Sequence, residues 1–235
     1  MRLYLVTIML FIICPSAANA DETCKTINAY SANWRGISEF GDSMPLQGVA
    51  IDAVKKLLTH QDLPYTIKPR KNWPRLLAAL KRGEIDMIGG IYKTTDRLKD
   101  ISFIGPIHRV PVHIYTTKGN AEFIKTKEDL TGKVTIMSTH SSFGEEIEAY
   151  LAEKTTVLKI SSYDFHITKM LARGRIDFFV GTQLNSLNDI KVAGLEGKII
   201  ELEEPIGFND VYLGLSKKSP CYDHIVNISI YPVVE

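Results

Sequence analysis

A short run of polar side chains, Ser138–Ser142 (Ser-Thr-His-Ser-Ser), is the densest group with chemical potential in the chain. It follows an apolar run at Val134–Met137 and precedes the charged segment Glu145–Lys154, so the pattern predicts a buried strand, a turn and a helix. Backbone N–H groups point outward at such a turn and favour anions. We therefore expect an anion-binding turn here, since no nucleophile–base pair or metal-ligand spacing stands out in the sequence.

Four acidic residues are candidates for acid–base chemistry, but only by position. Asp86 and Asp177 begin two similar predicted strands, where a carboxylate is more often a turn cap than a catalyst. Glu145 and Glu146 open the helix that follows the polar turn. None of these acids has a partner at a spacing that indicates catalysis, so no catalytic residue is assigned.

The segment Leu76–Arg97 contains the elements that organise the rest of the chain. It reads as an amphipathic helix, a glycine stop at Gly83, a short buried strand and a polar turn ending in Arg97. Asn72 is expected to be the N-cap of the helix. Pro74 fits its first turn, where a missing N–H is not needed.

The helix–glycine–strand pattern occurs a second time at Met170–Gly181. Both copies contain Leu-x-Arg-Gly-x-Ile-Asp, from Leu80 to Asp86 and from Leu171 to Asp177. A unit that returns after about one small-domain length suggests two similar lobes. Because strands and helices alternate on both sides, we expect an α/β fold in which each lobe has a mainly parallel sheet flanked by helices.

The first twenty residues have the composition of a cleaved secretory signal. Arg2 is followed by an apolar run and by the small-residue site Ala18-Asn19-Ala20, and the run is too short to span a bilayer. We expect cleavage of 1–20 and a periplasmic mature chain beginning at Asp21. Without Arg2 the basic and acidic residues balance, and no basic stripe or tail is present, so nucleic acid is not an expected partner.

The chain has three cysteines, and Cys14 lies inside the expected signal. Cys24 and Cys221 remain near the two ends of the mature chain. In an exported protein such a pair is more often a disulfide than a pair of reactive thiols. We expect a Cys24–Cys221 disulfide.

Several loose motifs follow one another in a specific order. They are Gly48-x-x-Ile51-Asp52, the segment from Trp73 to Ile88, Thr94-x-x-Arg97, Ile101-Ser102-Phe103-x-x-Pro106, Leu130-x-Gly132-Lys133-Val134 and Leu213–Lys217. Together they resemble the extracellular solute-binding proteins of the polar amino-acid type, which are substrate-binding components of ABC transporters. The resemblance implies two lobes joined by two strands, closing on a ligand like a flytrap.

The resemblance also implies a domain organisation and partners. We expect lobe 1 to comprise 21–110 and 209–235, and lobe 2 to comprise 111–208. The expected partners are a small-molecule solute and an inner-membrane transporter permease. A monomer is expected, with no cofactor.

By the same resemblance, Arg97 is expected to bind a ligand carboxylate through two parallel hydrogen bonds. Trp34 and Trp73 match aromatic positions that stack on the ligand, with an ordinary core role as the alternative for each. Ser141 matches a second-lobe hydroxyl that contacts the ligand. The full expected site is Trp34, Trp73, Gly90, Tyr92, Arg97, Ser141 and Thr182.

The chain departs from the family pattern at three places. Thr182 stands where amino-acid-binding members keep an acid for the ligand's ammonium, and Tyr92 replaces a smaller hydroxyl residue. A carboxylate-bearing ligand is therefore expected, while its identity, and whether it is an α-amino acid, stay open. After Ser219-Pro220 the usual two helices are replaced by an apolar, β-like tail, so we expect a shortened or altered end to lobe 1.

The leading functional hypothesis is a periplasmic binding protein that delivers a polar solute to a transporter. The second is a periplasmic dehydratase acting on a cyclohexadienyl acid, which would need a carboxylate poised in the cleft. The third is a stand-alone ligand-sensing module. The sequence favours the first, and an enzyme is not expected.

Overall fold

The computed structural model describes residues 24–59, 63–161 and 166–227. The expected signal at 1–20 and the apolar tail at 228–235 lie outside the described residues. The strands are β1 Ile27–Ser31, β2 Tyr65–Pro69, β3 Met87–Tyr92, β4 Ile101–Thr117, β5 Val134–Ser138, β6 Thr156–Ile160, β7 Phe178–Thr182, β8 Ile199–Glu201 and β9 Gly207–Ser216. The α-helices are α1 Val49–Leu58, α2 Trp73–Arg82, α3 Glu145–Lys154, α4 His166–Ala172, α5 Gln183–Val192 and α6 Tyr222–Ile225. Short 3₁₀ helices occupy Arg97–Lys99, Asn120–Glu122 and Lys127–Leu130.

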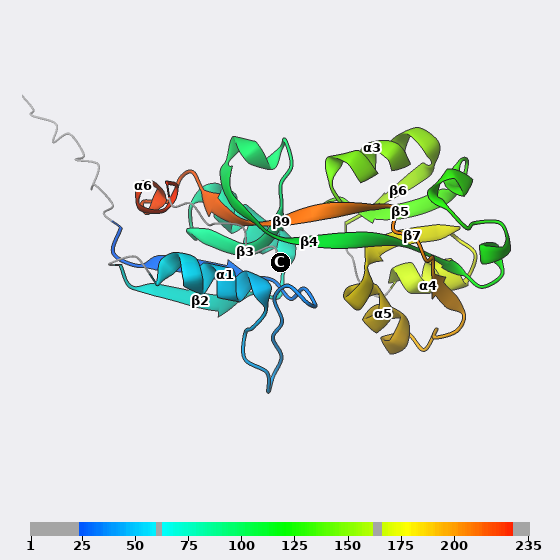
Figure 1. Ribbon diagram of the computed structural model, residues 1–235, viewed down its shortest axis with the longest axis horizontal. Coiled ribbons are helices and arrows are strands. Elements are labelled where there is room, and N and C mark those ends of the chain that lie inside the picture. Colours follow the sequence, from blue (N-terminus) through cyan, green and yellow to red (C-terminus); the bar gives the residue numbers. More distant parts are fainter. Residues whose placement is uncertain (1–23, 60–62, 162–165, 228–235) are drawn as a thin grey trace, which may run out of the picture.

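The helices and strands form two lobes joined by the long strands β4 and β9 (Figure 1). One lobe contains β1, β2, β3, α1, α2 and α6, and the other contains β5 to β8 and α3 to α5. Strand order in the larger sheet is β2-β1-β3-β9-β4-β7, and β5 and β6 form a separate parallel pair. This arrangement confirms the expected two-lobed α/β fold.

The sheets are more mixed than a mainly parallel arrangement. The pairs β1–β2, β1–β3 and β5–β6 are parallel, whereas β3–β9, β4–β7, β4–β8 and β4–β9 are antiparallel. Every antiparallel pair among the described strands therefore contains β4 or β9. The reason is topological, because a chain that leaves one lobe and returns beside its outgoing strand must run antiparallel to it.

The strand β4 continues through Gly105-Pro106, and its register with β9 shifts between Ile104 and His108. A proline without an N–H is tolerated at such an irregularity. The strand therefore passes as one element from lobe 1 into lobe 2.

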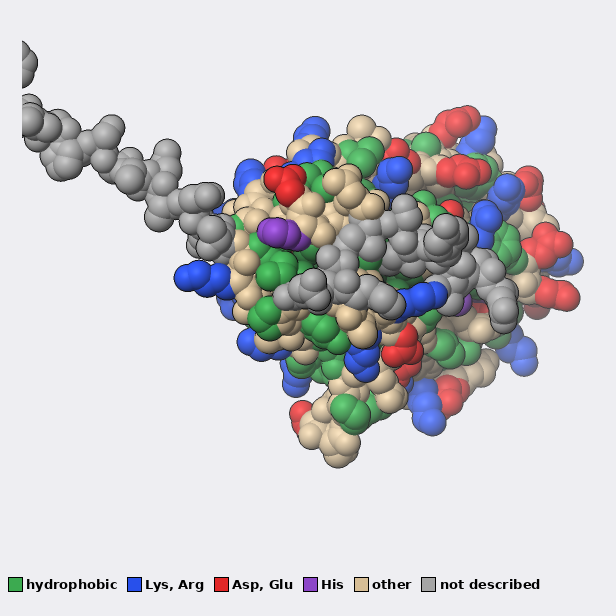
Figure 2. Space-filling model, turned by 60° about the vertical axis from the view of Figure 1, so that its left-hand side comes forward, with side chains coloured by type: hydrophobic (Ala, Val, Ile, Leu, Met, Phe, Trp, Pro, Cys, Tyr) green, Lys and Arg blue, Asp and Glu red, His purple; other side chains and the backbone are tan. Residues whose placement is uncertain are grey.

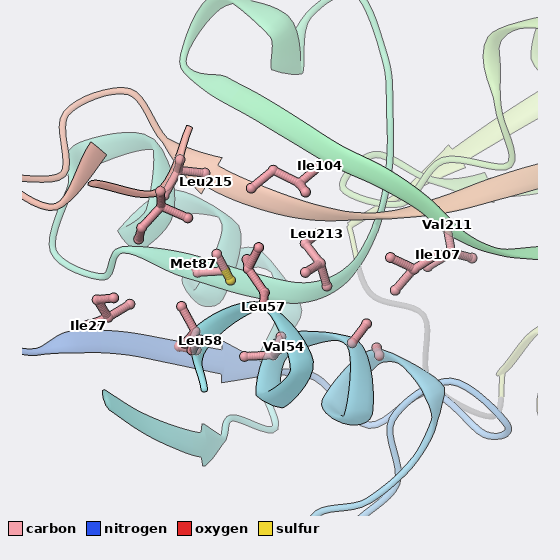
Figure 3. Packing of buried hydrophobic residues seen from close by; sticks show 14 of the residues in the cluster. Ile27, Val54, Leu57, Leu58, Met87, Ile104, Ile107, Val211, Leu213 and Leu215 are labelled. Carbon is pink, nitrogen blue, oxygen red and sulfur yellow. The ribbon is translucent and has the colours of Figure 1, made fainter. Parts of the chain in front are cut away.

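Helices cover both faces of each sheet. In lobe 1, α1 packs Val54, Leu57 and Leu58 against one face (Figure 3). The helix α2 packs Leu76 and Leu80 against the other face. In lobe 2, α3 covers one face, while α4 and α5 cover the opposite one. These cores are the rigid supports from which the loops between the lobes project.

The predicted limits of α2 are confirmed. The Asn72 side chain accepts a hydrogen bond from the Arg75 backbone N–H at 2.9 Å, and Pro74 lies in the first turn. Gly83 ends the helix in the left-handed conformation, with φ 81°. Its position matters further, because a Cβ there would lie 2.8 Å from the Lys218 carbonyl oxygen.

The repeated aspartates cap equivalent strands in the two lobes. Asp86 accepts a hydrogen bond from the Asn28 backbone N–H at 2.7 Å, and Asp177 accepts one from the Val134 N–H at the same distance. In each case the Asp backbone N–H also donates to the carbonyl oxygen of the same partner. The two carboxylates are thus structural, which agrees with their interpretation as turn caps.

The expected disulfide joins Cys24 to Cys221, with Cα atoms 4.7 Å apart. Cys221 is buried and packs with the lobe 1 core, so the bond ties the start of the first strand to the segment after β9. Within the described residues, no helix combines the length and apolar character needed to cross a membrane.

Candidate functional site

A cavity of about 270 Å³ lies between the two lobes. Its lobe 1 wall comes from the loop after β1, the start of α2 and the segment from β3 to Arg97. Its lobe 2 wall comes from the turn after β5, from α4, and from β7 with α5. All seven residues expected at the site line this cavity: Trp34, Trp73, Gly90, Tyr92, Arg97, Ser141 and Thr182.

Arg97 is the basic side chain of this cavity, and it is only 6% exposed. Its Nη1 donates a hydrogen bond to the Tyr92 carbonyl oxygen at 2.6 Å, which uses one of the five N–H donors of a guanidinium. Its carbon Cζ lies 5.5 Å from the centre of the Trp73 ring. Burial lowers the pKa of Arg97 to about 10, an effect that the charges of Glu148 and Asp96 partly offset. The side chain is therefore a fixed cation at neutral pH.

Aromatic rings surround this cation on the lobe 1 wall. Trp34 and Tyr92 meet edge to face, with ring centres 4.9 Å apart. Tyr92 is buried, and its hydroxyl has no hydrogen-bond partner among the described residues. Burial raises the pKa of Tyr92, so the phenol stays neutral and keeps its proton as a donor. The wall thus combines apolar ring faces with one cation.

The lobe 2 wall combines small polar side chains with Phe143, Ile167 and Phe179, and it carries no basic side chain among the described lining residues. Ser141 and Ser142 come from the turn between β5 and α3, and Thr182 is the N-cap of α5 without a side-chain capping bond. The turn was expected to hold an anion, and the anion it holds is internal. The Glu148 carboxylate accepts hydrogen bonds from the Phe143 N–H at 2.9 Å and from the Ser142 hydroxyl at 2.6 Å.

The helix α5 adds residues that were not predicted. Asn185, Ser186 and Asp189 line the cavity together with Thr182. The signal for them was present in the sequence, because polar residues recur three to four positions apart from Thr182 to Asp189, which places them on one helix face. The sequence alone does not indicate which face of this helix lines the cavity.

Among the described residues, four hydrogen bonds at three places connect the lobes at the edges of the cavity. The Trp73 indole N–H donates to the His140 carbonyl oxygen at 2.8 Å, and the Arg35 backbone N–H donates to Asn185 Oδ1 at 3.1 Å. The Thr95 backbone N–H and hydroxyl both donate to the Glu145 carboxylate, which lowers the pKa of Glu145. Trp73 is therefore an inter-lobe contact as well as a cavity wall.

Comparison with known proteins identifies the family. Residues 29–186 match the model of the bacterial extracellular solute-binding proteins, family 3. The chain belongs to this family. It is 29% identical to the L-cystine-binding protein of Escherichia coli K12 over 154 residues, which cover 64% of the chain and 56% of that protein. The chain thus spans little more than half the length of this curated relative.

Solved structures show the same fold at low sequence identity. The second periplasmic flytrap (VFT2) domain of BvgS from Bordetella pertussis has a TM-score of 0.66 and 19% identity, covering 86% of the chain and 85% of that domain. An ancestral arginine-binding protein bound to arginine has a TM-score of 0.65 and 21% identity, covering 86% and 89%. Both are two-lobed proteins, which confirms the fold.

Proposed function

We propose that the chain binds a small polar solute bearing a carboxylate between its lobes in the periplasm, and delivers it to an inner-membrane transporter. The observation that carries this proposal is the place of Arg97. A buried guanidinium on the wall of an inter-lobe cavity is costly unless an anion or hydrogen-bond acceptor compensates it. A carboxylate matches its planar pair of donors in a way that a neutral group does not.

The six other expected residues support the same assignment. Trp34, Trp73 and Tyr92 supply flat apolar surface for the carbon skeleton of a solute, while Gly90 adopts a left-handed conformation, with φ 86°, beside them. Ser141 and Thr182 supply hydroxyls from the opposite lobe. We propose that closure places the ligand between these two sets, since the hydrogen bonds from Trp73 and Thr95 already join the lobes around the cavity.

We propose the lobe boundaries 21–110 with 209–235, and 111–208. Val110 and Asn209 are direct partners in the β4–β9 ladder, which supports a boundary where both strands cross from one lobe to the other. Cleavage of 1–20 is part of the same proposal. Mass spectrometry of exported protein is expected to find Asp21 as the first residue, and retention of Met1 would contradict it.

We also propose that the protein is a monomer and that nucleic acid is not a partner. On the face seen in Figure 2, basic and acidic side chains are interspersed. Such a surface does not provide the continuous positive potential that nucleic acids require. Light scattering of the purified mature chain tests the monomer.

The experiment that tests carboxylate recognition is a two-stage binding assay. A thermal-shift screen of the mature protein covers carboxylates, amino acids, amines and oligopeptides, including the L-cystine and arginine named for its relatives. Each hit is then compared by calorimetry with its carboxamide, which removes only the negative charge. We expect the carboxamide to bind at least tenfold more weakly. Equal binding of acid and amide would reject the proposal.

Delivery to a transporter has its own test. Deleting the gene in the host is expected to reduce uptake of the labelled ligand found by calorimetry, and plasmid expression of the chain should restore it. Unchanged uptake would favour the sensing role.

A further inference from the structure

One acidic side chain, Asp189, lies on the cavity wall opposite Arg97. Among the described residues that line the cavity, Arg97 and Asp189 are the two that carry a charge at neutral pH. The cation comes from lobe 1, next to β3, and the anion comes from α5 in lobe 2. A cavity with one charge of each sign on opposite walls is suited to a ligand with two charged ends.

The surroundings of Asp189 favour a cation beside it. The side chain is half-buried, and burial raises its pKa, while a hydrogen bond with Asn188 and the charge of Arg35 act in the opposite direction. Phe143 and Phe179 line the same cavity. A carboxylate that is partly removed from water is stabilised by an opposite charge.

The polar face of α5 runs along the cavity instead of meeting it at one point. Thr182 at its N-cap, Asn185 and Ser186 in the middle, and Asp189 near its end all line the cavity. Leu184 and Leu187, on other sides of the helix, are exposed. Seven residues of helix advance about 10 Å, so Asp189 is two turns beyond Thr182.

We propose that Asp189 accepts a cationic group at the far end of the ligand, so that the site takes solutes whose carboxylate and ammonium or guanidinium are separated by a flexible chain. This inference rests on the proposed carboxylate role of Arg97. Thr182 stands where an acid near the carboxylate end would pair an α-ammonium, and it is neutral. The acid on this wall, Asp189, lies two turns further along α5, which selects a remote cation over an adjacent one.

The test uses two pairs of probes that differ only in the remote charge. These are 6-aminohexanoate with hexanoate, and L-arginine with L-citrulline. Calorimetry of the wild type is expected to show at least tenfold tighter binding of the charged member of each pair. Asp189→Asn keeps the size of the side chain and should bring the two members within threefold, without weakening the neutral one. Glu204→Gln removes an exposed acid outside the cavity lining and should change nothing.

Each other outcome has a defined meaning. If Asp189→Asn weakens both members of a pair equally, or leaves their difference intact, the inference is wrong. If Arg35→Gln reproduces the effect of Asp189→Asn, the carboxylate serves an inter-lobe ion pair and the inference is also wrong. If the charge preference depends on Asp189 but Arg97→Ala has no effect on either member, the proposed anion site fails while the cation site stands. Failure of the wild type to bind any of the four probes would count against both.

Discussion

The two walls of the cavity differ in chemistry although the lobes behind them share a plan. Both walls contain aromatic rings, but the lobe 1 wall adds a deeply buried guanidinium, while the lobe 2 wall adds several hydroxyls, an amide and a half-buried carboxylate. Rings and a fixed cation suit a constant feature of a ligand class, such as a carboxylate on a carbon chain. Short polar side chains on a helix suit selection among members of that class.

The shared plan is visible in the repeated aspartates. Asp86 and Asp177 make the same bond to the strand that starts each lobe. Asp86 is more deeply buried and also accepts a hydrogen bond from the Ser219 hydroxyl, next to the disulfide at Cys221. The two lobes therefore share the same helix–strand arrangement and aspartate cap, and they differ in the disulfide and in the side chains that line the cavity.

The largest expected effect comes from replacing Arg97 on the lobe 1 wall. Arg97→Ala should cost roughly 2–5 kcal/mol of carboxylate binding, about 30-fold or more, because the anion loses its paired donors. Arg97→Lys should recover only part, since a point charge does not reproduce the planar fork. Calorimetry decides, with Arg109→Ala as the control at an exposed site on β4. Tight binding of a common amino acid that Arg97→Ala leaves intact would show that the assignment is wrong.

The next effect is on stability and concerns the Cys24–Cys221 disulfide, which belongs to lobe 1. Replacing both Cys24 and Cys221 by Ser should lower the free energy of unfolding by roughly 2–5 kcal/mol, since the unfolded chain regains freedom between distant positions. Urea unfolding measures the loss. A reductant should destabilise the wild type but not the double variant. Two free thiols in unreduced, denatured wild type would contradict the bond itself.

A smaller loss of stability is expected when the aspartate of either repeat copy is replaced, and the two losses can be compared directly. Asp86→Ala leaves the partly buried Asn28 N–H and the buried Ser219 hydroxyl without this acceptor, and should cost about 1–3 kcal/mol of stability. Asp177→Ala removes the equivalent bond at a half-buried site and should cost less. Each variant is the control for the other in urea unfolding. Equal losses would show that burial does not distinguish the copies.

The smallest expected effect comes from adding a carboxylate to the lobe 2 wall at Thr182. Thr182→Asp places an acid at the position where the family resemblance implies a partner for an α-ammonium, so α-amino acids should bind about tenfold more tightly, near 1.4 kcal/mol. Ligands without an ammonium should bind more weakly, and Thr182→Asn controls for size. Thr182 is also the N-cap of α5. A higher melting temperature with unchanged binding would mean that the new carboxylate caps the helix instead.

Much of the fold and the cavity followed from local sequence signals. Asn72, Pro74 and Gly83 act within a few residues of their own position, so their roles in limiting α2 were predictable. The seven expected site residues meet at one cavity because the family motifs fix their places at the ends of strands and helices. The disulfide was predictable from the expected export of the chain and from its cysteine count, since only two cysteines remained after the expected signal.

What sequence reasoning missed depends on contacts between distant segments. Asp189 reaches the cavity only because α5 packs with one particular face toward lobe 1. The bond between Thr95 and Glu145 joins two lobes whose relative placement no local pattern encodes. The course of β4 through Gly105-Pro106 likewise depends on its partner β9, which arrives about a hundred residues later.

The course of β4 and β9 has a consequence for how such proteins change. The chain leaves lobe 1 and returns to it through neighbouring strands, with Val110 opposite Asn209. The second lobe is therefore one uninterrupted stretch of coding sequence inserted into the first, with its two junctions side by side. Exchanging that cassette between related genes replaces the selective wall in a single recombination event. Arg97 and the disulfide stay with the recipient, so a new specificity can be acquired while the proposed carboxylate anchor is kept.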